Sequence, residues 1–205
     1  MLQIIFKQLL QSYTSNEQEV QLLWSEVEVS HSAPHRYYHT LTHLEHMHQQ
    51  LVPCKNWIDD WDTILFSLFY HDIIYDPLQS DNEEQSAALA VQRLQALSYP
   101  ELKIARCQEQ ILATNKHKQQ ADTDANYFID ADLSVLGSNW NTYAQYAANV
   151  RKEYAVYPDS VYKPGRYQVL QHFLQMERIY KTPYFLECFE IQARQNLRRE
   201  LQQLG

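Results

Sequence analysis

A histidine and an aspartate stand where an apolar helical stripe predicts hydrophobic side chains. In residues 57–76, WIDDWDTILFSLFYHDIIYD, a helical repeat of about 100° per residue gathers five apolar side chains on one face: Trp57, Trp61, Ile64, Leu65 and Leu68. His71 and Asp72 continue that face, within roughly 60° of its centre. Because an unpaired buried carboxylate is strongly disfavoured, Asp72 would need a cation, a cluster of donors or a proton. The alternative is a helix that ends near Tyr70 and leaves Asp72 in solvent.

A second aspartate shares an apolar face in residues 126–137, NYFIDADLSVLG. That face consists of four residues: Phe128, Ile129, Leu133 and Leu136. Asp132 lies within the face, whereas Asp130 points roughly 130° away from its centre. We therefore expect Asp132 to be the buried carboxylate, and Asp130 to be solvated or to support a ligand. Two carboxylates that met in a core without a cation would repel each other.

Residues 31–51, HSAPHRYYHTLTHLEHMHQQL, hold six of the nine histidines. If residues 40–52 are helical, one side carries Leu41, Leu44, Met47, His48 and Leu51. His43 lies at the edge of that side and can reach inward, while His39 and His46 lie nearer solvent. A histidine at such an edge is usually an ordinary packed residue, and a histidine-rich run can also bind metal loosely without catalysis.

Imidazole and carboxylate ligands together suit a particular class of metal ion. A set of His43, His71, Asp72 and Asp132 would favour a divalent ion such as Mn, Mg, Fe, Zn, Co or Ni over a thiolate-bound metal. Four protein ligands leave positions of an octahedral shell open for water and a phosphate oxygen. The three cysteines, at 54, 107 and 188, are too widely spaced for a zinc knuckle and indicate reduced thiols in a cytoplasmic protein.

Helices must position these residues, because nearly every segment has helical periodicity. The predicted helices are 2–12, 17–28, 40–52, 57–74, 82–97, 101–115, 124–137, 140–155, 161–180 and 184–204. Only three glycines occur, which argues against a β architecture with many hairpins. We expect one all-α domain over 1–205, a compact multi-helix bundle.

The composition restricts the partners. A formal net charge of −8 over 205 residues repels nucleic acid and anionic lipid. No apolar run approaches the length of a membrane span. We therefore expect no membrane and no nucleic acid as partner, and a small substrate instead, with a homodimer left open.

The ordered motifs resemble the HD-domain superfamily of metal-dependent phosphohydrolases. The matching ligand segments are YHTLTHLEHM, LFYHDIIYD and FIDADLSVLG. Further segments look like a small bacterial subgroup of that superfamily: DNEEQSA, ILATNKH, VRKEYA, GRYQVLQHFL and EIQARQNLRREL. The resemblance covers nearly the whole chain. It implies His43, His71, Asp72 and Asp132 as metal ligands, and a metal-binding core over about 36–137 followed by C-terminal helices over about 138–205.

The resemblance implies hydrolysis of a phosphate ester, in a nucleotide or another small phosphorylated metabolite. Asp72 would orient or deprotonate a water, and Glu83, rather than Glu84, would serve as general acid or base; acidic residues are also common in a first helical turn. The phosphate could contact basic side chains: Arg36, Lys116, His117, Arg151 and Arg166. Helix capping and ordinary ion pairs are the alternatives for these five.

Two other functions stay open. His39 is the alternative metal ligand, and with His46 and His117 it could build a dinuclear site for a phosphodiesterase or an iron-dependent oxygenase. The other alternative is a non-catalytic binding protein that keeps the metal for stability.

Overall fold

The computed structural model describes residues 1–204, and every regular element in that range is a helix. In chain order the elements are α1 (Leu2–Gln11), α2 (Glu17–His31), α3 (Leu41–Leu51), η1 (Val52–Trp57), α4 (Trp61–Tyr70), α5 (Asn82–Ala96), α6 (Glu101–Ala113), α7 (Thr123–Asp132), η2 (Leu133–Gly137), α8 (Trp140–Glu153), α9 (Asp159–Gln175) and α10 (Pro183–Leu204). The elements η1 and η2 are short 3-10 helices. The predicted all-α class is confirmed.

The chain divides into two compact units, Met1–Ile129 and the residues from Asp130 onward. The boundary lies within α7, before the position near 137 where we expected a metal-binding core to give way to C-terminal helices. The N-terminal helices α1 and α2, which precede the expected core, belong to the first unit.

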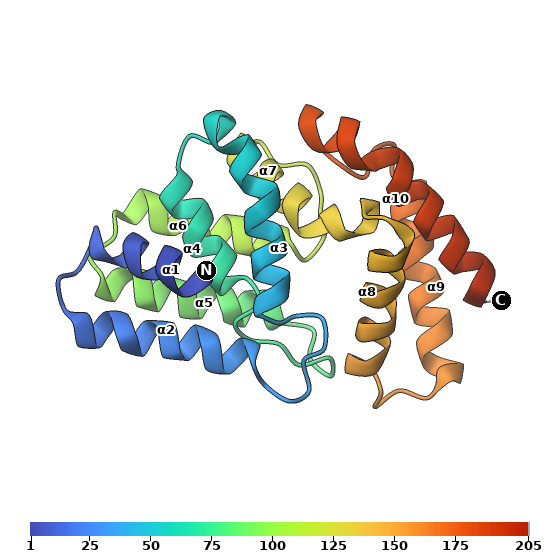
Figure 1. The fold of residues 1–205 in the computed structure, drawn as a ribbon, viewed down its shortest axis with the longest axis horizontal. Coiled ribbons are helices and arrows are strands. Elements are labelled where there is room, and N and C mark those ends of the chain that lie inside the picture. Colours follow the sequence, from blue (N-terminus) through green and yellow to red (C-terminus); the bar gives the residue numbers. More distant parts are fainter. Residues whose placement is uncertain (205) are drawn as a thin grey trace. The chain divides into compact units, whose positions relative to one another are not determined.

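Helix α4 is the centre of the first unit. It packs against α1, α3, α5 and α6, while α1 and α2 lie side by side (Figure 1). All its residues from Thr63 to Tyr70 are buried, as expected for a helix that is apolar around its circumference. Each large side chain buried here, such as Phe66 or Phe69, contributes about 1.5–3 kcal/mol. The end of α4 is therefore a rigid place from which to hold a functional group.

Helix α4 is shorter than the predicted helix 57–74. Asp60 caps its N-terminus and accepts a hydrogen bond from the backbone N–H of Thr63 at 3.3 Å. The buried Asp124 of α7 accepts the backbone N–H of Asp60 and that of the preceding residue, both at 2.9 Å. These bonds fix an extended link before α4, so Trp57 lies in η1 with 56% of its surface exposed. Its predicted place on the apolar stripe of α4 is wrong.

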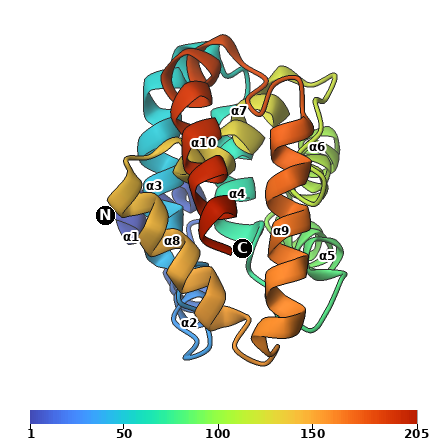
Figure 2. The same ribbon diagram turned by 90° about the vertical axis from the view of Figure 1, so that its right-hand side faces the viewer.

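The second unit contains η2, α8, α9 and α10 (Figure 2). Helix α10 packs against η2 and α9. Its buried Glu200 receives two hydrogen bonds from Arg166 of α9, at 2.7 and 2.9 Å, and one from the hydroxyl of Tyr143 on α8. Removing one partner of a buried ion pair costs about 3–5 kcal/mol. This cluster is therefore a main link between the three helices.

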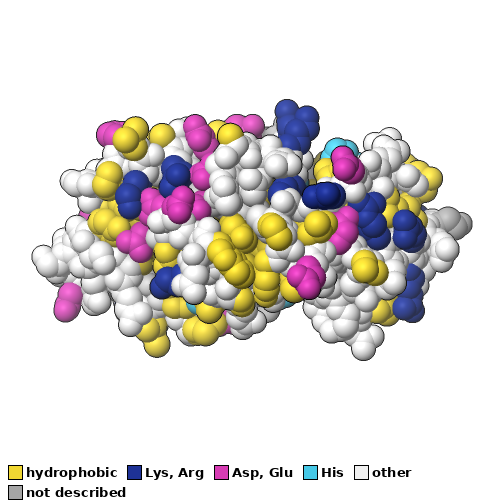
Figure 3. Space-filling view, turned by 90° about the horizontal axis from the view of Figure 1, so that it is seen from above, with side chains coloured by type: hydrophobic (Ala, Val, Ile, Leu, Met, Phe, Trp, Pro, Cys, Tyr) yellow, Lys and Arg dark blue, Asp and Glu magenta, His cyan; other side chains and the backbone are white. Residues whose placement is uncertain are grey.

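The two units differ in charge. The first unit has eight Lys and Arg against 17 Asp and Glu, and the second has nine against eight. Figure 3 shows one face of the molecule, on which Lys and Arg side chains as well as Asp and Glu side chains reach the surface. The acidic excess therefore belongs to the unit that holds most of the histidines. Within residues 1–204, none of the helices has the length and apolar character to cross a membrane.

Gly137 permits a close approach inside the second unit. A Cβ atom at this position would lie 2.6 Å from the Cβ atom of Phe189 and 2.7 Å from the carbonyl oxygen of Phe189, on α10. We expect Gly137→Ala to lower the free energy of unfolding by about 1–3 kcal/mol, because the backbone of α10 must move. Urea unfolding followed by circular dichroism measures this. The matched control is Gly165→Ala, since nothing lies within 4 Å of its added Cβ. Equal stability of the two variants would contradict the prediction.

Candidate metal centre

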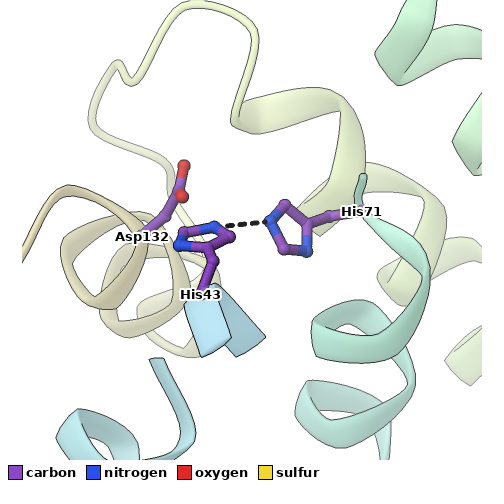
Figure 4. A group of neighbouring side chains, drawn as sticks. All are labelled: His43, His71 and Asp132. Carbon is purple, nitrogen blue, oxygen red and sulfur yellow. Dashed lines mark hydrogen bonds between the residues drawn. The ribbon is translucent and has the colours of Figure 1, made fainter. Parts of the chain in front are cut away.

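His43 and His71 face each other inside the first unit. His43 lies on α3 and is 3% exposed, and His71 directly follows α4 and is 1% exposed. Their Nε2 atoms are 3.3 Å apart. Figure 4 shows the two rings turned towards each other from separate helices. Two imidazole nitrogens at this distance must share a proton or a cation, because two lone pairs repel.

The other ring nitrogen of His71 settles which atom faces the site. Nδ1 of His71 lies 3.0 Å from the carbonyl oxygen of Leu68, one turn back along α4. Since a carbonyl oxygen only accepts, Nδ1 carries a proton and donates it to Leu68. When the ring is neutral, the lone pair of Nε2 then faces His43. Metal-binding histidines are oriented by this kind of bond from their second nitrogen.

Asp72 adds a carboxylate to the same place. Its Oδ2 lies 3.0 Å from Nε2 of His71 and 3.7 Å from Nε2 of His43. Helix α4 ends at Tyr70, as in the alternative, yet the side chain of Asp72 is only 18% exposed. Burial by itself would raise the pKa of this carboxyl, but the imidazoles of His71, His39 and His43 hold the pKa well below its usual value. Asp72 is therefore an anion in the first unit.

Asp132 completes the group from the end of α7. It is the last residue of that helix and is half-buried. One of its carboxylate oxygens and one ring nitrogen each of His43 and His71 all lie within 4.8 Å of one another. The Asp132 side chain lies beside the two rings in Figure 4. Three of the expected ligands thus form one group, and the contacts of Asp72 join it to the same histidines.

The expected burial of the two α7 aspartates is wrong. Asp130 is fully buried, although it was expected to be solvated or to support a ligand, and Asp132 is half-buried. The carboxylate of Asp130 accepts hydrogen bonds from the backbone N–H groups of Lys181 and Thr182 and from the hydroxyl of Thr182, at 2.7–2.9 Å. Burial raises the pKa of Asp130 to about 6. Asp130 therefore holds the segment just before α10. The apolar pattern of α7 does not show that this side of the helix is covered.

The chemistry of the donor set fits a divalent cation. Two neutral imidazole nitrogens and two carboxylates suit Mn, Fe, Zn, Co or Ni, and the carboxylates also suit Mg. No thiol belongs to the group. A proton on one imidazole would also satisfy the 3.3 Å contact between the two rings. A metal ion would satisfy all four side chains at once.

Arg36 holds the backbone around the site. Its guanidinium donates to the carbonyl oxygens of His39 at 3.1 Å, Asp72 at 2.6 Å and Ile73 at 3.0 Å. The side chain is 7% exposed and lies over the ring of Tyr75. These donors are directed at carbonyl groups, which gives Arg36 a structural role, and its expected phosphate contact stays a prediction. Arg36 links the segment before α3 to the segment after α4, so it positions Asp72.

Three other candidates of the first unit lie outside the His43–His71–Asp132 group. Glu83, in the first turn of α5, is half-buried and accepts a hydrogen bond from Asn115 at 3.1 Å. Lys116 is exposed, and His117 has a positive φ of 48° just after α6. The catalytic role of Glu83 and the phosphate contacts of Lys116 and His117 stay predictions.

His39 lies close to the group without belonging to it. Its ring is 5.9 Å from that of His43 and 4.1 Å from that of Tyr75, between centroids. It is half-buried, whereas His43 is buried. The side chain within reach of His71 is therefore His43, and His39 stays the candidate for a second ion.

The remaining two phosphate candidates are engaged within the second unit. Arg151 pairs with Asp159 at 2.9 Å and donates to two backbone carbonyls. Arg166 pairs with Glu200. Both guanidinium groups are neutralised, so their contacts give no support to the expected phosphate role.

Sequence reasoning missed two residues. For Arg36 the sequence predicts only a phosphate contact and not its structural role, since no spacing links it to the carbonyl groups that follow α4. His31 was overlooked although it continues the buried series Val20, Trp24 and Val27 of α2. Its Nδ1 lies 2.9 Å from the carbonyl oxygen of Val27. The helical spacing of that series could have identified His31 as a core residue.

Comparison of the chain with models of protein families, with curated proteins and with solved structures finds no match.

The role of Arg36 is testable by substitution. We expect Arg36→Lys to weaken Mn²⁺ binding about 10- to 100-fold, because an ammonium cannot bridge three carbonyl groups and Asp72 loses its support. Isothermal titration of the purified protein measures the affinity. Arg106→Lys, at a half-buried ion pair with Asp122, serves as control. An unchanged metal affinity combined with a raised KM for phosphate substrates would favour the phosphate contact instead.

His31 should make the first unit sensitive to acid. Burial, with a smaller effect from the charge of Arg36, lowers the pKa of His31 to about 3, from 6.5 when exposed. The folded state therefore excludes a proton that the unfolded state binds, and stability falls as pH falls from about 6.5 towards 3.

Between pH 6 and pH 5 we expect the wild type to lose about 1 kcal/mol more unfolding free energy than His31→Asn, whose amide can still donate to Val27. Urea titrations at both pH values measure this. His35→Asn, at an exposed histidine, should follow the wild type. Equal pH dependence of wild type and His31→Asn would contradict the prediction.

Proposed function

We propose that the protein is a metal-dependent phosphohydrolase of the HD-domain type, acting on a nucleotide or another small phosphorylated metabolite. The observation that carries the proposal is the convergence of His43, His71 and Asp132 within 4.8 Å, with Asp72 in contact with both histidines. These are the four residues that the sequence resemblance implies as ligands, in the same order along the chain. The reducing setting that the cysteines suggest, a cytoplasm, fits this proposal.

In this proposal His43, His71, Asp72 and Asp132 would hold the metal. A divalent ion bound there would lower the pKa of a water and polarise a phosphoryl oxygen. Asp72, kept anionic by the neighbouring imidazoles, can orient an attacking water by accepting a hydrogen bond from it, while its lowered pKa makes it a weak base. The bond from Nδ1 of His71 to Leu68 keeps the ring oriented, so its lone pair needs no reorganisation.

A second candidate is a dinuclear HD-type phosphodiesterase or oxygenase. The observation in its favour is the ring of His39, whose centroid lies 5.9 Å from that of His43 and 4.1 Å from that of Tyr75. Two tightly bound ions per chain, iron above all, would favour it over a single-ion hydrolase. We expect His39→Ala to remove one of two ions in that case and none otherwise.

The test of the proposed function is a metal-supplemented screen of nucleotides and phosphorylated metabolites. His71→Ala and Asp72→Ala should each lower kcat/KM at least about 100-fold on any substrate found, which is the scale of losing a metal ligand. His35→Ala, at an exposed histidine of the same unit, is the matched control and should keep full activity.

The same variants separate the alternatives. If both His71→Ala and Asp72→Ala keep a measured phosphatase activity, the assignment is wrong. If metal removal lowers the melting temperature of the wild type while no substrate turns over, the protein is a metal-stabilised binding protein and not an enzyme.

A further inference from the structure

A cavity opens in the second unit, where α8 gives way to α9. Its volume is about 380 Å³, within the range of about 300–1,000 Å³ that small-molecule sites occupy. The wall is made by Tyr154, Tyr157 and Tyr162 together with three valines, Gly165 and Arg166. All of these residues lie between 150 and 169, at the end of the unit where a short connection joins the two helices (Figure 2). The cavity is thus a local feature, built without any residue of the metal centre.

Tyrosine rings give the cavity flat walls. The rings of Tyr154 and Tyr157 are stacked, with centroids 6.2 Å apart and planes 28° apart. The ring of Tyr162 lies 6.1 Å from that of Tyr154. All three side chains are half-buried, so each presents part of its surface to solvent. Flat, partly exposed tyrosine rings favour a planar aromatic partner over a flexible chain.

The charges at the cavity are already neutralised. Arg166, at the base, makes two hydrogen bonds to Glu200 and is 7% exposed. Arg151 lies over the ring of Tyr162 at 4.5 Å and pairs with Asp159. Because each guanidinium has its carboxylate, the cavity offers no unbalanced positive charge for a phosphate. An uncharged ligand fits it better than an anion.

Helix α9 carries Pro164 and Gly165 next to each other in its interior. Glycine in a helix costs about 1 kcal/mol relative to alanine, and proline removes a backbone donor. Nothing lies within 4 Å of an added Cβ at Gly165, so packing does not require glycine there. A side chain at 165 would instead take up space at the wall of the cavity. A ligand that occupies this space would explain why residue 165 is a glycine.

We propose that this cavity binds a planar, uncharged heteroaromatic ring of the size of a nucleobase. The tyrosine rings would stack on it, the valines would cover its edge, and Gly165 would leave room for its entry. The site is separate from the proposed phosphohydrolase centre, so the two proposals can fail independently.

Saturation-transfer NMR on the full chain tests the proposal, with adenosine and uridine as ring probes and ribose as the non-aromatic control. We expect transfer to base protons and none to free ribose. Gly165→Leu and Tyr162→Ala should each weaken nucleoside binding at least tenfold. Val156→Leu, at an exposed valine that does not line the cavity, should leave it unchanged. His71→Ala should also leave it unchanged. Gly165→Ala should raise the melting temperature and still weaken binding, which separates loss of space from loss of fold.

Several results would overturn the proposal. These are no transfer to either nucleoside at millimolar concentration, binding that survives both Gly165→Leu and Tyr162→Ala, or binding that is lost in His71→Ala. Self-association of the chain through this patch, without nucleoside binding, would also overturn it. If Gly165→Leu fails to fold by circular dichroism, Tyr162→Ala and Gly165→Ala decide the matter.

Discussion

Two imidazole nitrogens 3.3 Å apart, with a carboxylate oxygen 3.0 Å from one of them, need a proton or a cation between them, because two lone pairs repel. Much of the first unit serves to bring these groups together. Helix α4 is buried from Thr63 to Tyr70 and ends directly before His71, so the ring is held at the end of a helix that packs against four others. The bond from Nδ1 of His71 to Leu68 then decides which nitrogen faces inward. The site thus depends on a proton or a cation that relieves the repulsion between these groups.

The surrounding side chains hold this arrangement through hydrogen bonds to backbone groups rather than through ion pairs. Arg36 donates hydrogen bonds to backbone carbonyl oxygens on both sides of the site. Just beyond it, the hydroxyl of Ser86 on α5 accepts from the backbone N–H of Ile74 and donates to its carbonyl oxygen. The guanidinium of Arg36 therefore has a structural role, because it supports the backbone on both sides of the site. The acidic excess of the first unit leaves it electrostatically suited to a cation, whereas the second unit is nearly balanced.

The sequence predicts the helical class and the polar residues on apolar stripes, because both depend on periodicity within one segment. His43 and His71 are buried as their positions indicated. The errors arise where contacts with a distant segment determine the burial of a residue or the start of a helix. Asp130 is buried because Lys181 and Thr182 cover it from far along the chain, and α4 starts late because Asp124 fixes the link before it. Such partners have no fixed spacing, so no helical wheel could show them.

The proposed function depends on a divalent metal ion that would bind between His43 and His71. Pulsed electron paramagnetic resonance of the Mn²⁺-loaded protein tests it most directly, because nitrogen nuclei bonded to the ion give a resolved coupling. We expect coupling to two imidazole nitrogens in the wild type and to one in His43→Ala. A spectrum of hydrated Mn²⁺ without nitrogen coupling, or one unchanged in His43→Ala, would contradict it.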